Sequence, residues 1–275
     1  MSESSRFSIG NIQVGRGNNF FLIAGPCVIE SADHTRFIAR QLQAISGRLR
    51  VPFIFKASFD KANRTSLSSY RGPGLQEGLS VLHSIRQELG ITVLTDVHEV
   101  SQIELVAQAV DCLQIPAFLS RQTDLLVAAA KSGCAVNVKK GQFLAPWDMQ
   151  PVVDKLTSAG CRRVLLTERG SCFGYNNLVV DMRSLAIMRG FGFPVVFDVT
   201  HSLQLPGGLG TSSGGQPQFI EPLARAGVAV GVDGIFMEVH EEPAAALSDG
   251  PNALPLDHVE PLLKQLIEID AAVSK

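Results

Sequence analysis

The sequence predicts an α/β fold, specifically a single (β/α)8 TIM barrel that begins with a short N-terminal β-hairpin. Short apolar runs recur eight times, segments with helical periodicity lie between them, and no Pro/Ser-rich linker or charge block divides the 275 residues. Strands that alternate with helices require right-handed crossovers, and eight such units close most simply into a barrel of roughly 250 residues. We therefore expect one domain over residues 1–275, with residues 1–18 as the hairpin extension.

Local sequence patterns predict each element of this fold. Residues 7–10 and 13–15, with Gly and Asn between them, predict the hairpin. Apolar residues at a spacing of about 3.6 predict helices, for example at 35–45, 101–109 and 123–130. Near-continuous apolar runs are typical of strands that are buried on both faces of a parallel sheet. Such runs predict strands at 20–24, 51–55, 91–94, 112–115, 135–138, 163–166, 194–197 and 234–237.

Composition excludes several classes of protein. Hydrophobic residues make up 45% of the chain and charged residues 18%, with a formal net charge of -2, which is ordinary for a globular protein and gives no basic field for nucleic acid. No secretory signal begins the sequence, and no apolar stretch approaches the roughly 20 residues of a membrane helix. The cysteines are odd in number and widely spread, which predicts free thiols in a reducing cytoplasm: Cys27, Cys112, Cys134, Cys161 and Cys172.

Polar and charged residues stand at the end of almost every predicted strand. The carboxyl ends of all strands in a parallel barrel converge on one rim, where catalytic groups collect. One polar strand end is usually a solvated terminus, but a series of eight is harder to explain in that way. The residues are Cys27, Glu30, Lys56, Asp96, Gln114, Lys139, Glu168, Arg169, Asp198, His201 and Glu238.

A cluster of cations at this rim predicts a site for anionic ligands. Lys56 and Lys139 each end an apolar strand, and Lys61, Arg64 and Arg169 follow in the adjoining loops. Arg supplies fork-like contacts to carboxylates and phosphates, while Lys supplies point charges. The alternative for any one of these residues is a solvated surface cation. Function is favoured for Lys56 and Lys139, because they stand directly at the catalytic rim.

Four further residues predict a divalent metal site. Cys27, His201, Glu238 and Asp249 form no short ligand motif, so their spacing alone is a weak signal. They follow or end the first, seventh and eighth strands, which become neighbours when a barrel closes. One thiolate, one imidazole and two carboxylates suit Zn, Fe, Mn or Co without singling one out. Packing of Cys27 and ion pairing of Glu238 are the alternatives.

The remaining features carry less functional information. Cys112, Cys134 and Cys161 lie in or beside apolar runs and predict packing, whereas Cys172 has no evident base beside it. Residues 205–218 are rich in Gly and Ser, so they predict either a mobile active-site lid or an ordinary surface loop.

Many of these segments together resemble the 3-deoxy-D-manno-octulosonate 8-phosphate synthase family. The resemblance covers nearly the whole chain. The segments are IAGPCVIES (23–31), FKASFDKANRTS (55–66), LTDVHE (94–99), LQIPAFL (113–119), VNVKKGQFLAPWD (136–148), TERG (167–170), FGYNNL (173–178), FDVTHSLQLPG (197–207), MEVH (237–240) and LSDGPN (247–252).

The resemblance implies a homotetrameric, cytoplasmic transferase that joins phosphoenolpyruvate to D-arabinose 5-phosphate for lipopolysaccharide biosynthesis. It implies that phosphoenolpyruvate is held by Lys56, Lys61, Lys139 and Arg169, with Gln114, Ala117 and Phe118 lining its pocket. Asn63, Arg64 and Thr65 would hold the pentose phosphate, and Arg121 would reach it from a neighbouring subunit. Asp96, His201 and Gln204 would surround the reacting carbons. The catalytic candidates are thus Lys56, Asp96, Lys139 and His201.

The resemblance also bears on the metal and on the rival functions. Cys at position 27, with His201, Glu238 and Asp249 present, is similar to the metal-dependent branch of the family. The nearest rival is a 3-deoxy-D-arabino-heptulosonate 7-phosphate synthase that uses erythrose 4-phosphate. Its aldose loop carries a Lys-Pro-Arg-Thr pattern, whereas this chain has Lys-Ala-Asn-Arg at 61–64. A non-catalytic sugar-phosphate sensor on the same scaffold is the alternative from another class.

Overall fold

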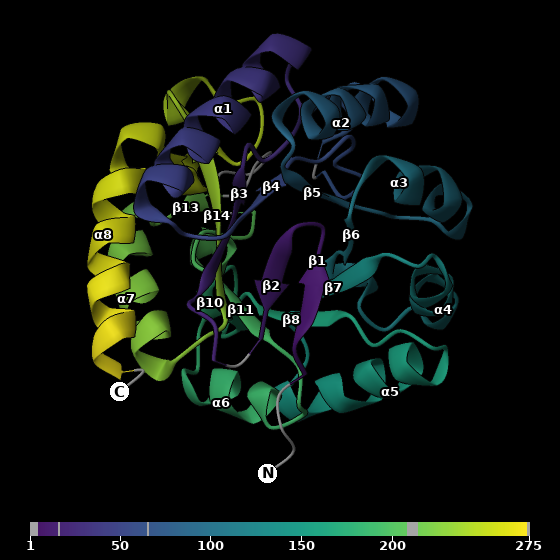
Figure 1. The fold of residues 1–275 in the computed structure, drawn as a ribbon, viewed down its shortest axis with the longest axis vertical. Coiled ribbons are helices and arrows are strands. Elements are labelled where there is room, and N and C mark those ends of the chain that lie inside the picture. The colour runs from purple at the N-terminus through teal and green to yellow at the C-terminus, as the bar shows by residue number, and fades with distance from the viewer. Residues whose placement is uncertain (1–4, 16, 65, 208–213, 274–275) are drawn as a thin grey trace.

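A computed structural model describes residues 5–15, 17–64, 66–207 and 214–273 of the chain. Eight parallel strands form a closed barrel, because β11 pairs with both β8 and β14, and β14 pairs with β3 (Figure 1). All eight predicted strands are confirmed. They are β3 (Phe21–Gly25), β4 (Phe53–Lys56), β5 (Thr92–Asp96), β6 (Cys112–Ile115), β7 (Ala135–Lys139), β8 (Val164–Glu168), β11 (Val195–Asp198) and β14 (Gly234–His240).

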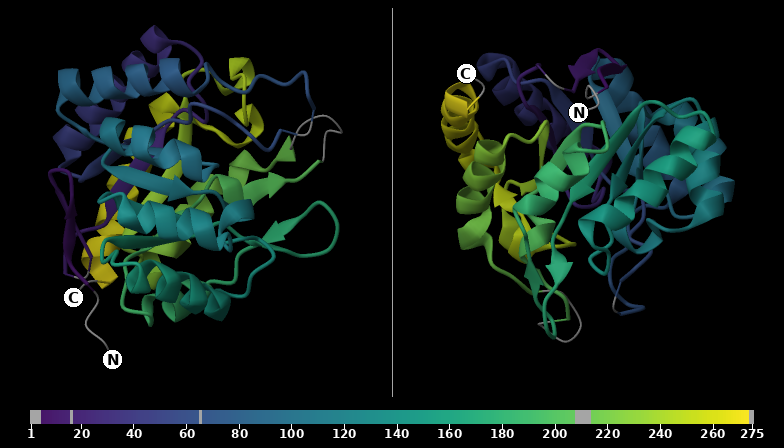
Figure 2. Two further views of the ribbon diagram at one scale, coloured as in Figure 1. Left: turned by 90° about the vertical axis from the view of Figure 1, so that its right-hand side faces the viewer. Right: turned by 90° about the horizontal axis from the view of Figure 1, so that it is seen from below.

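Helices surround the barrel in the order that the crossover rule requires (Figures 1 and 2). Local signals fix their ends: the Ser31 hydroxyl accepts the His34 backbone N–H at the start of α1, and Gly90 ends α2 in the left-handed conformation with a φ of 63°. They are α1 (Ala32–Leu49), α2 (Leu75–Leu89), α3 (Ile103–Ala109), α4 (Thr123–Lys131), α5 (Gln150–Ser158), α6 (Arg183–Arg189), α7 (Ile220–Val230) and α8 (Leu256–Val273).

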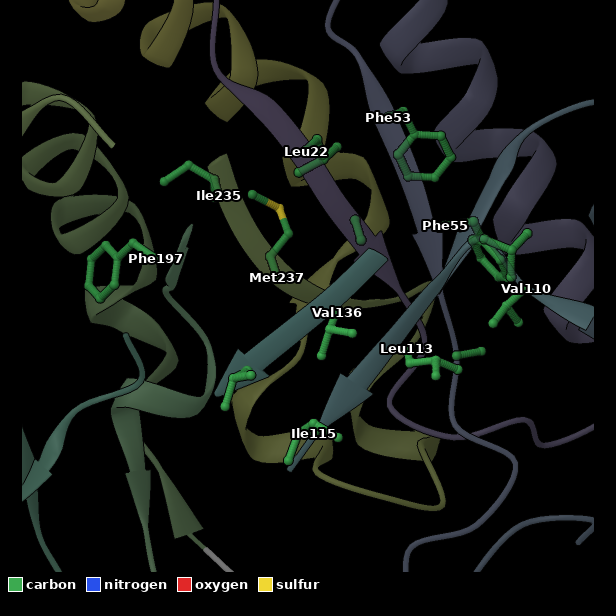
Figure 3. Packing of buried hydrophobic residues seen from close by; sticks show 14 of the residues in the cluster. Leu22, Phe53, Phe55, Val110, Leu113, Ile115, Val136, Phe197, Ile235 and Met237 are labelled. Carbon is green, nitrogen blue, oxygen red and sulfur yellow. The ribbon is translucent and has the colours of Figure 1, made fainter. Parts of the chain in front are cut away.

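The core has two parts. The larger lies between the strands and the helices and includes Phe55, Phe197 and Met237 (Figure 3). The smaller fills the barrel itself, where Phe21 and Phe236 are almost fully buried. Every residue of the eight barrel strands is buried, which accounts for their near-continuous apolar sequences.

The predicted N-terminal hairpin closes one end of the barrel. Its strands are β1 (Phe7–Ile9) and β2 (Ile12–Val14). Ile9 and Val14 are fully buried against the core inside the barrel. The loop-rich rim lies at the opposite end (Figure 2, left). The hairpin therefore seals the floor and leaves the carboxyl ends of the strands as the open mouth.

Short elements shape that mouth. Three extra strand pairings occur at or near the rim, formed by β9 (Ser171–Cys172) with β10 (Leu178–Val179), β12 (Gln204–Leu205) with β13 (Gly214–Gly215), and β15 (Leu254–Pro255) with β14. The single-turn 3₁₀ helices are η1 (Val100–Gln102), η2 (Ala117–Leu119), η3 (Pro146–Met149), η4 (His201–Leu203), η5 (Pro217–Phe219), η6 (Pro243–Ala245) and η7 (Gly250–Asn252). Among the described residues, no helix combines the length and the apolar character needed to cross a bilayer.

Candidate active site and metal centre

The carboxyl ends of the barrel strands open into a cavity of about 620 Å³. Most of the residues that the sequence nominated for substrate binding, catalysis or metal binding line this cavity. They are Lys56, Lys61, Asn63, Arg64, Asp96, Gln114, Ala117, Phe118, Lys139, Arg169, His201, Gln204 and Asp249. Pro206 and Gly207, from the 205–218 segment expected to be a lid or a surface loop, also line the cavity. Residues 208–213 of that segment and Thr65 lie outside the described residues.

The four nominated metal ligands lie together at one side of the cavity. Ligand atoms of Cys27, Glu238 and Asp249 are all within 4.8 Å of one another. Cys27 Sγ is 3.3 Å from Asp249 Oδ2. His201 Nε2 lies 3.5 Å from Glu238 Oε1 and 3.7 Å from Asp249 Oδ2. The pairing of β3 with β14 and of β14 with β11 explains why residues so distant in sequence meet.

The chemistry of this cluster fits a divalent cation. Glu238 Oε2 is buried and has no hydrogen-bond partner among the described residues. Burial alone would raise the pKa of Glu238, but the charges of Lys56 and His201 outweigh it and lower the pKa to about 2. Burial and the carboxylate of Asp249 raise the pKa of Cys27 well above its ordinary value. A bound cation reverses that shift, because a coordinated thiol is deprotonated.

Lys56 and Glu238 form a buried ion pair beneath the cavity. Lys56 Nζ donates to Glu238 Oε1 and to the Cys27 carbonyl oxygen, both at 2.8 Å. Both side chains of the ion pair are 1% exposed. Lys56 thus orients two of the nominated metal-site residues, in addition to lining the cavity.

Asp198 holds His201 and Lys139 in place. His201 Nδ1 lies 2.7 Å from Asp198 Oδ2, and Lys139 Nζ donates to the same oxygen at 2.5 Å. A carboxylate on one ring nitrogen leaves the other available as a ligand, an arrangement common at metal sites. Burial lowers the pKa of Lys139. Its ammonium also lies 3.7 Å from the ring centroid of Phe236.

Asp96 and Lys61 carry opposite charges within the cavity wall. Asp96 Oδ1 accepts a short hydrogen bond from Ser58, and Oδ2 lies 3.1 Å from His98 Nε2. Burial would raise the pKa of Asp96, but Lys61 and His98 outweigh it and lower the pKa well below its usual range. Burial opposes the charge of Lys61, yet the neighbouring acidic groups, first Cys27 and then Glu238, raise its pKa well above the ordinary value.

Arg169 is positioned through its backbone and its side chain. Its Nη2 donates to Gln204 Oε1 at 2.7 Å. The Glu168 carboxylate accepts the backbone N–H groups of Arg169 and Gly170. Lys140, which is fully buried, lies 3.3 Å from Glu168 Oε1. Glu168 therefore fixes the turn that points Arg169 into the cavity. The sequence predicts a rim position for both residues but does not indicate this role of Glu168.

The remaining nominated residues differ in their surroundings. Arg64 Nη1 donates to the Ser248 hydroxyl at 2.8 Å. Gln114 Oε1 accepts from Asn137 Nδ2 at 3.0 Å. Arg121 is exposed and does not line the cavity of this chain within the described residues, so its assignment to a neighbouring subunit stays a prediction.

Sequence reasoning missed the roles of Asp198, Ser248 and Lys140. The sequence identifies Asp198 only as a polar residue at a strand end, and no motif rule points to Ser248. Lys140 was not nominated, because the adjacent Lys139 already stands at the strand end. The one signal available in the sequence was the pair of adjacent lysines, Lys139 and Lys140, at the end of a buried strand. It could have suggested that one cation faces the cavity and the other packs behind it.

A second group of possible ligands, Glu30, His34 and His240, lies near the metal cluster. The Glu242 backbone N–H donates to His240 Nδ1 at 3.0 Å, so the neutral ring carries its proton on Nε2. That nitrogen lies 3.5 Å from Glu30 Oε1. His240 Nε2 is buried and has no hydrogen-bond partner among the described residues.

The fold and the cavity define the class of protein, a (β/α)8-barrel enzyme with a cation-lined site at the carboxyl ends of its strands. Residues 2–275 match the model of the DAHP synthetase I family, and the chain belongs to that family.

Similar proteins carry the name 2-dehydro-3-deoxyphosphooctonate aldolase. The relative from Geobacter metallireducens is 60% identical over 266 residues, which are 97% of this chain and 98% of the relative. The relative from Trichlorobacter lovleyi is 59% identical over 270 residues, 98% of this chain and 99% of the relative. The relative from Syntrophotalea carbinolica is 61% identical over 265 residues, 96% of each chain.

Proposed function

We propose that this chain condenses phosphoenolpyruvate with D-arabinose 5-phosphate and water to give 3-deoxy-D-manno-octulosonate 8-phosphate and inorganic phosphate. The observation that carries the proposal is the name shared by relatives that are about 60% identical over nearly the full chain. The cation-lined cavity supports it, because the two substrates bring a carboxylate and two phosphates to one place.

The substrate roles follow from the positions of the cations. The four cations proposed to hold phosphoenolpyruvate are Lys56, Lys61, Lys139 and Arg169, and Gln114, Ala117 and Phe118 are proposed to line its pocket. Asn63 and Arg64, with Thr65, are proposed to hold the phosphate of the pentose. Two anions held side by side in oriented positions remove much of the entropic cost of a bimolecular reaction.

The condensation is proposed to be stepwise. C3 of phosphoenolpyruvate attacks the aldehyde carbon of the open-chain pentose phosphate, water adds at C2, and cleavage of the C2–O bond releases phosphate. Lys139 and Lys61 stabilise the developing negative charge from fixed positions in the cavity wall. Asp96 lies on the cavity wall, where its carboxylate can accept a proton from a reacting hydroxyl. His201 lies there too, but its ring nitrogens are taken by Asp198 and by the proposed ion, so it is proposed to act through that ion.

Cys27, His201, Glu238 and Asp249 are proposed to hold one divalent ion, of Zn, Fe, Mn or Co. Two observations support this: ligand atoms of Cys27, Glu238 and Asp249 lie within 4.8 Å of one another, and Glu238 Oε2 has no hydrogen-bond partner within the described part of the chain. When bound, such an ion supplies a Lewis acid that polarises a carbonyl oxygen or a water. Asp198 would keep His201 in the tautomer that exposes Nε2 to the ion, and Lys56 would orient Glu238.

Phosphate release in parallel reactions tests the proposal. Purified protein, supplied with metal and phosphoenolpyruvate, should release phosphate with arabinose 5-phosphate and much less with erythrose 4-phosphate. Equal or greater turnover with erythrose 4-phosphate would indicate the seven-carbon synthase, which the names of the relatives do not favour. No release with either sugar in metal-replete protein would indicate a sensor.

The wider organisation is proposed on the same basis. We propose one domain over residues 1–275 that works as a homotetramer in the cytoplasm. All five cysteines are free, which suits a reducing compartment and keeps Cys27 available as a ligand.

A further inference from the structure

Ser248 lies between the two halves of the candidate site. Its hydroxyl oxygen is 3.0 Å from Cys27 Sγ and accepts a hydrogen bond of 2.8 Å from Arg64 Nη1. The residue is 4% exposed. One buried hydroxyl therefore contacts a proposed metal ligand from the loop after β3 and a proposed sugar-phosphate ligand from the loop after β4.

The directions of these two hydrogen bonds follow from the groups involved. A guanidinium can only donate, so Ser248 Oγ is the acceptor toward Arg64. The Cys27 thiol also donates to Ser248 Oγ in this structure, which leaves the single proton of the hydroxyl available for a thiolate. Cysteine binds a metal as the thiolate, which can only accept. With an ion bound, Arg64 would therefore donate to Ser248, and Ser248 would donate to Cys27.

The surrounding loop keeps Ser248 in this place. The preceding residue, Leu247, donates its backbone N–H to Glu30 Oε1 at 2.8 Å. The following residue, Asp249, has a left-handed φ of 51°. At Gly250 a Cβ atom would lie 2.3 Å from the Pro243 carbonyl oxygen, so the loop is closely packed there. These contacts limit how far Ser248 can move away from Cys27.

Arg64 retains donor capacity for an anion. Its Nη1 is engaged by Ser248, while its Nε is buried without a hydrogen-bond partner among the described residues. Arg64 also lines the cavity beside Lys61 and Asn63. The contact with Ser248 can therefore set the orientation of the guanidinium before an anion arrives.

We infer that Ser248 is a positioning residue that couples metal binding at Cys27 to sugar-phosphate binding at Arg64. The inference rests on the proposed function. An ion fixes the thiolate, the thiolate fixes the hydroxyl, and the hydroxyl holds Arg64 ready for the phosphate. Coupling between two binding sites is reciprocal, so the sugar phosphate must strengthen metal binding by the same factor, commonly roughly 5- to 150-fold.

Titration with Co²⁺ tests this directly. Its dissociation constant is measured with and without arabinose 5-phosphate for the wild type, Ser248→Ala and the control Ser46→Ala, which also removes a buried hydroxyl that is 4% exposed but lies in α1. The wild type and Ser46→Ala should show the coupling, and Ser248→Ala should lose it. The thiolate-to-cobalt absorption band should move to lower energy in Ser248→Ala, because the sulfur loses a hydrogen bond.

Unchanged coupling and an unchanged band in Ser248→Ala would overturn the inference while leaving the proposed function intact. Failure of the proposed function is recognised separately, since the wild type would then not turn over arabinose 5-phosphate. If Ser248→Ala does not fold, Arg64→Met breaks the other contact and should also shift the cobalt band without any sugar present. A band at the wild-type position in Arg64→Met would contradict the inference.

Discussion

At the scale of single residues, the site depends on charged groups buried in pairs. Lys56 with Glu238, Lys139 with Asp198, and Lys140 with Glu168 each put a cation and a carboxylate in the same buried place. A buried charge that loses its partner is strongly destabilising. We therefore expect substitutions within these pairs to affect folding as well as catalysis, so each needs a measurement that separates the two effects.

Lys140→Met should destabilise the protein and also weaken phosphoenolpyruvate binding. The change leaves Glu168 without its buried cation, which should cost about 3–5 kcal/mol in the free energy of unfolding. The turn that Glu168 holds also carries Arg169, so the KM for phosphoenolpyruvate should rise more than kcat falls. Urea denaturation and steady-state kinetics measure both effects, with the exposed Lys131→Met as control. A loss below about 1 kcal/mol would show that Lys140 is not a structural cation.

Asp198→Asn should weaken metal binding without removing a ligand. Asp198 holds His201 Nδ1 at 2.7 Å, and loss of such a partner typically lowers metal affinity about 10- to 100-fold. Competition with a chelator of known affinity measures the change. Asp124→Asn, at an exposed position in α4, is the matched control. Wild-type affinity in Asp198→Asn would indicate that His201 is held in place without Asp198.

At the scale of elements, the hairpin and the helices show which local signals matter. Gly10 turns between β1 and β2 with a φ of 54°, and a Cβ there would lie 2.4 Å from Thr92 Oγ1. Gly47 lies inside α1, and a Cβ atom added there would meet no atom within 4 Å. The two glycines therefore differ in both backbone conformation and space.

The same substitution should have opposite effects at these two positions. Gly10→Ala should destabilise the protein by more than about 1 kcal/mol, because Ala is strained at positive φ and meets Thr92. Gly47→Ala should stabilise it by about 0.5–1 kcal/mol, because Ala is the better helix former. Chemical denaturation of both variants measures this. An unaffected Gly10→Ala variant would mean that the hairpin does not pack tightly on the barrel floor.

The elements could be predicted from the sequence because burial imposes a pattern. Strands such as β8 and β11 are buried on both faces and read as apolar runs, and the rim residues follow those runs directly. Contacts between loops could not be predicted in this way. Ser248 contacts Cys27, which lies 221 positions away in the sequence, and Arg64, which lies 184 positions away. No periodic pattern in a sequence shows which rim loops come into contact. These contacts form because the barrel is closed and because the backbone turns at Asp249.

At the scale of the whole molecule, the two ends of the barrel differ in what they contain. The hairpin and the inner core occupy the floor, while the cations and the candidate metal ligands occupy the opposite rim. Arg121 is the proposed exception to a site built from one chain. It is exposed beyond η2, where a neighbouring subunit could use it.

Arg121→Ala should raise the KM for arabinose 5-phosphate while leaving the KM for phosphoenolpyruvate near the wild-type value. A lost charge-assisted contact to phosphate is worth about 1.5–3 kcal/mol, so the rise should be roughly 10- to 150-fold. Steady-state kinetics measure it, with the exposed Arg162→Ala as control. An unchanged KM would remove Arg121 from the pentose site.

The most direct test of the whole account is anomalous diffraction from crystals loaded with cobalt. We expect one strong peak bonded to Cys27 Sγ and His201 Nε2, at distances of about 2.0–2.3 Å, with carboxylate oxygens of Glu238 and Asp249 completing the site. A peak elsewhere on the protein, or no peak within bonding distance of Cys27 in fully loaded crystals, would contradict it.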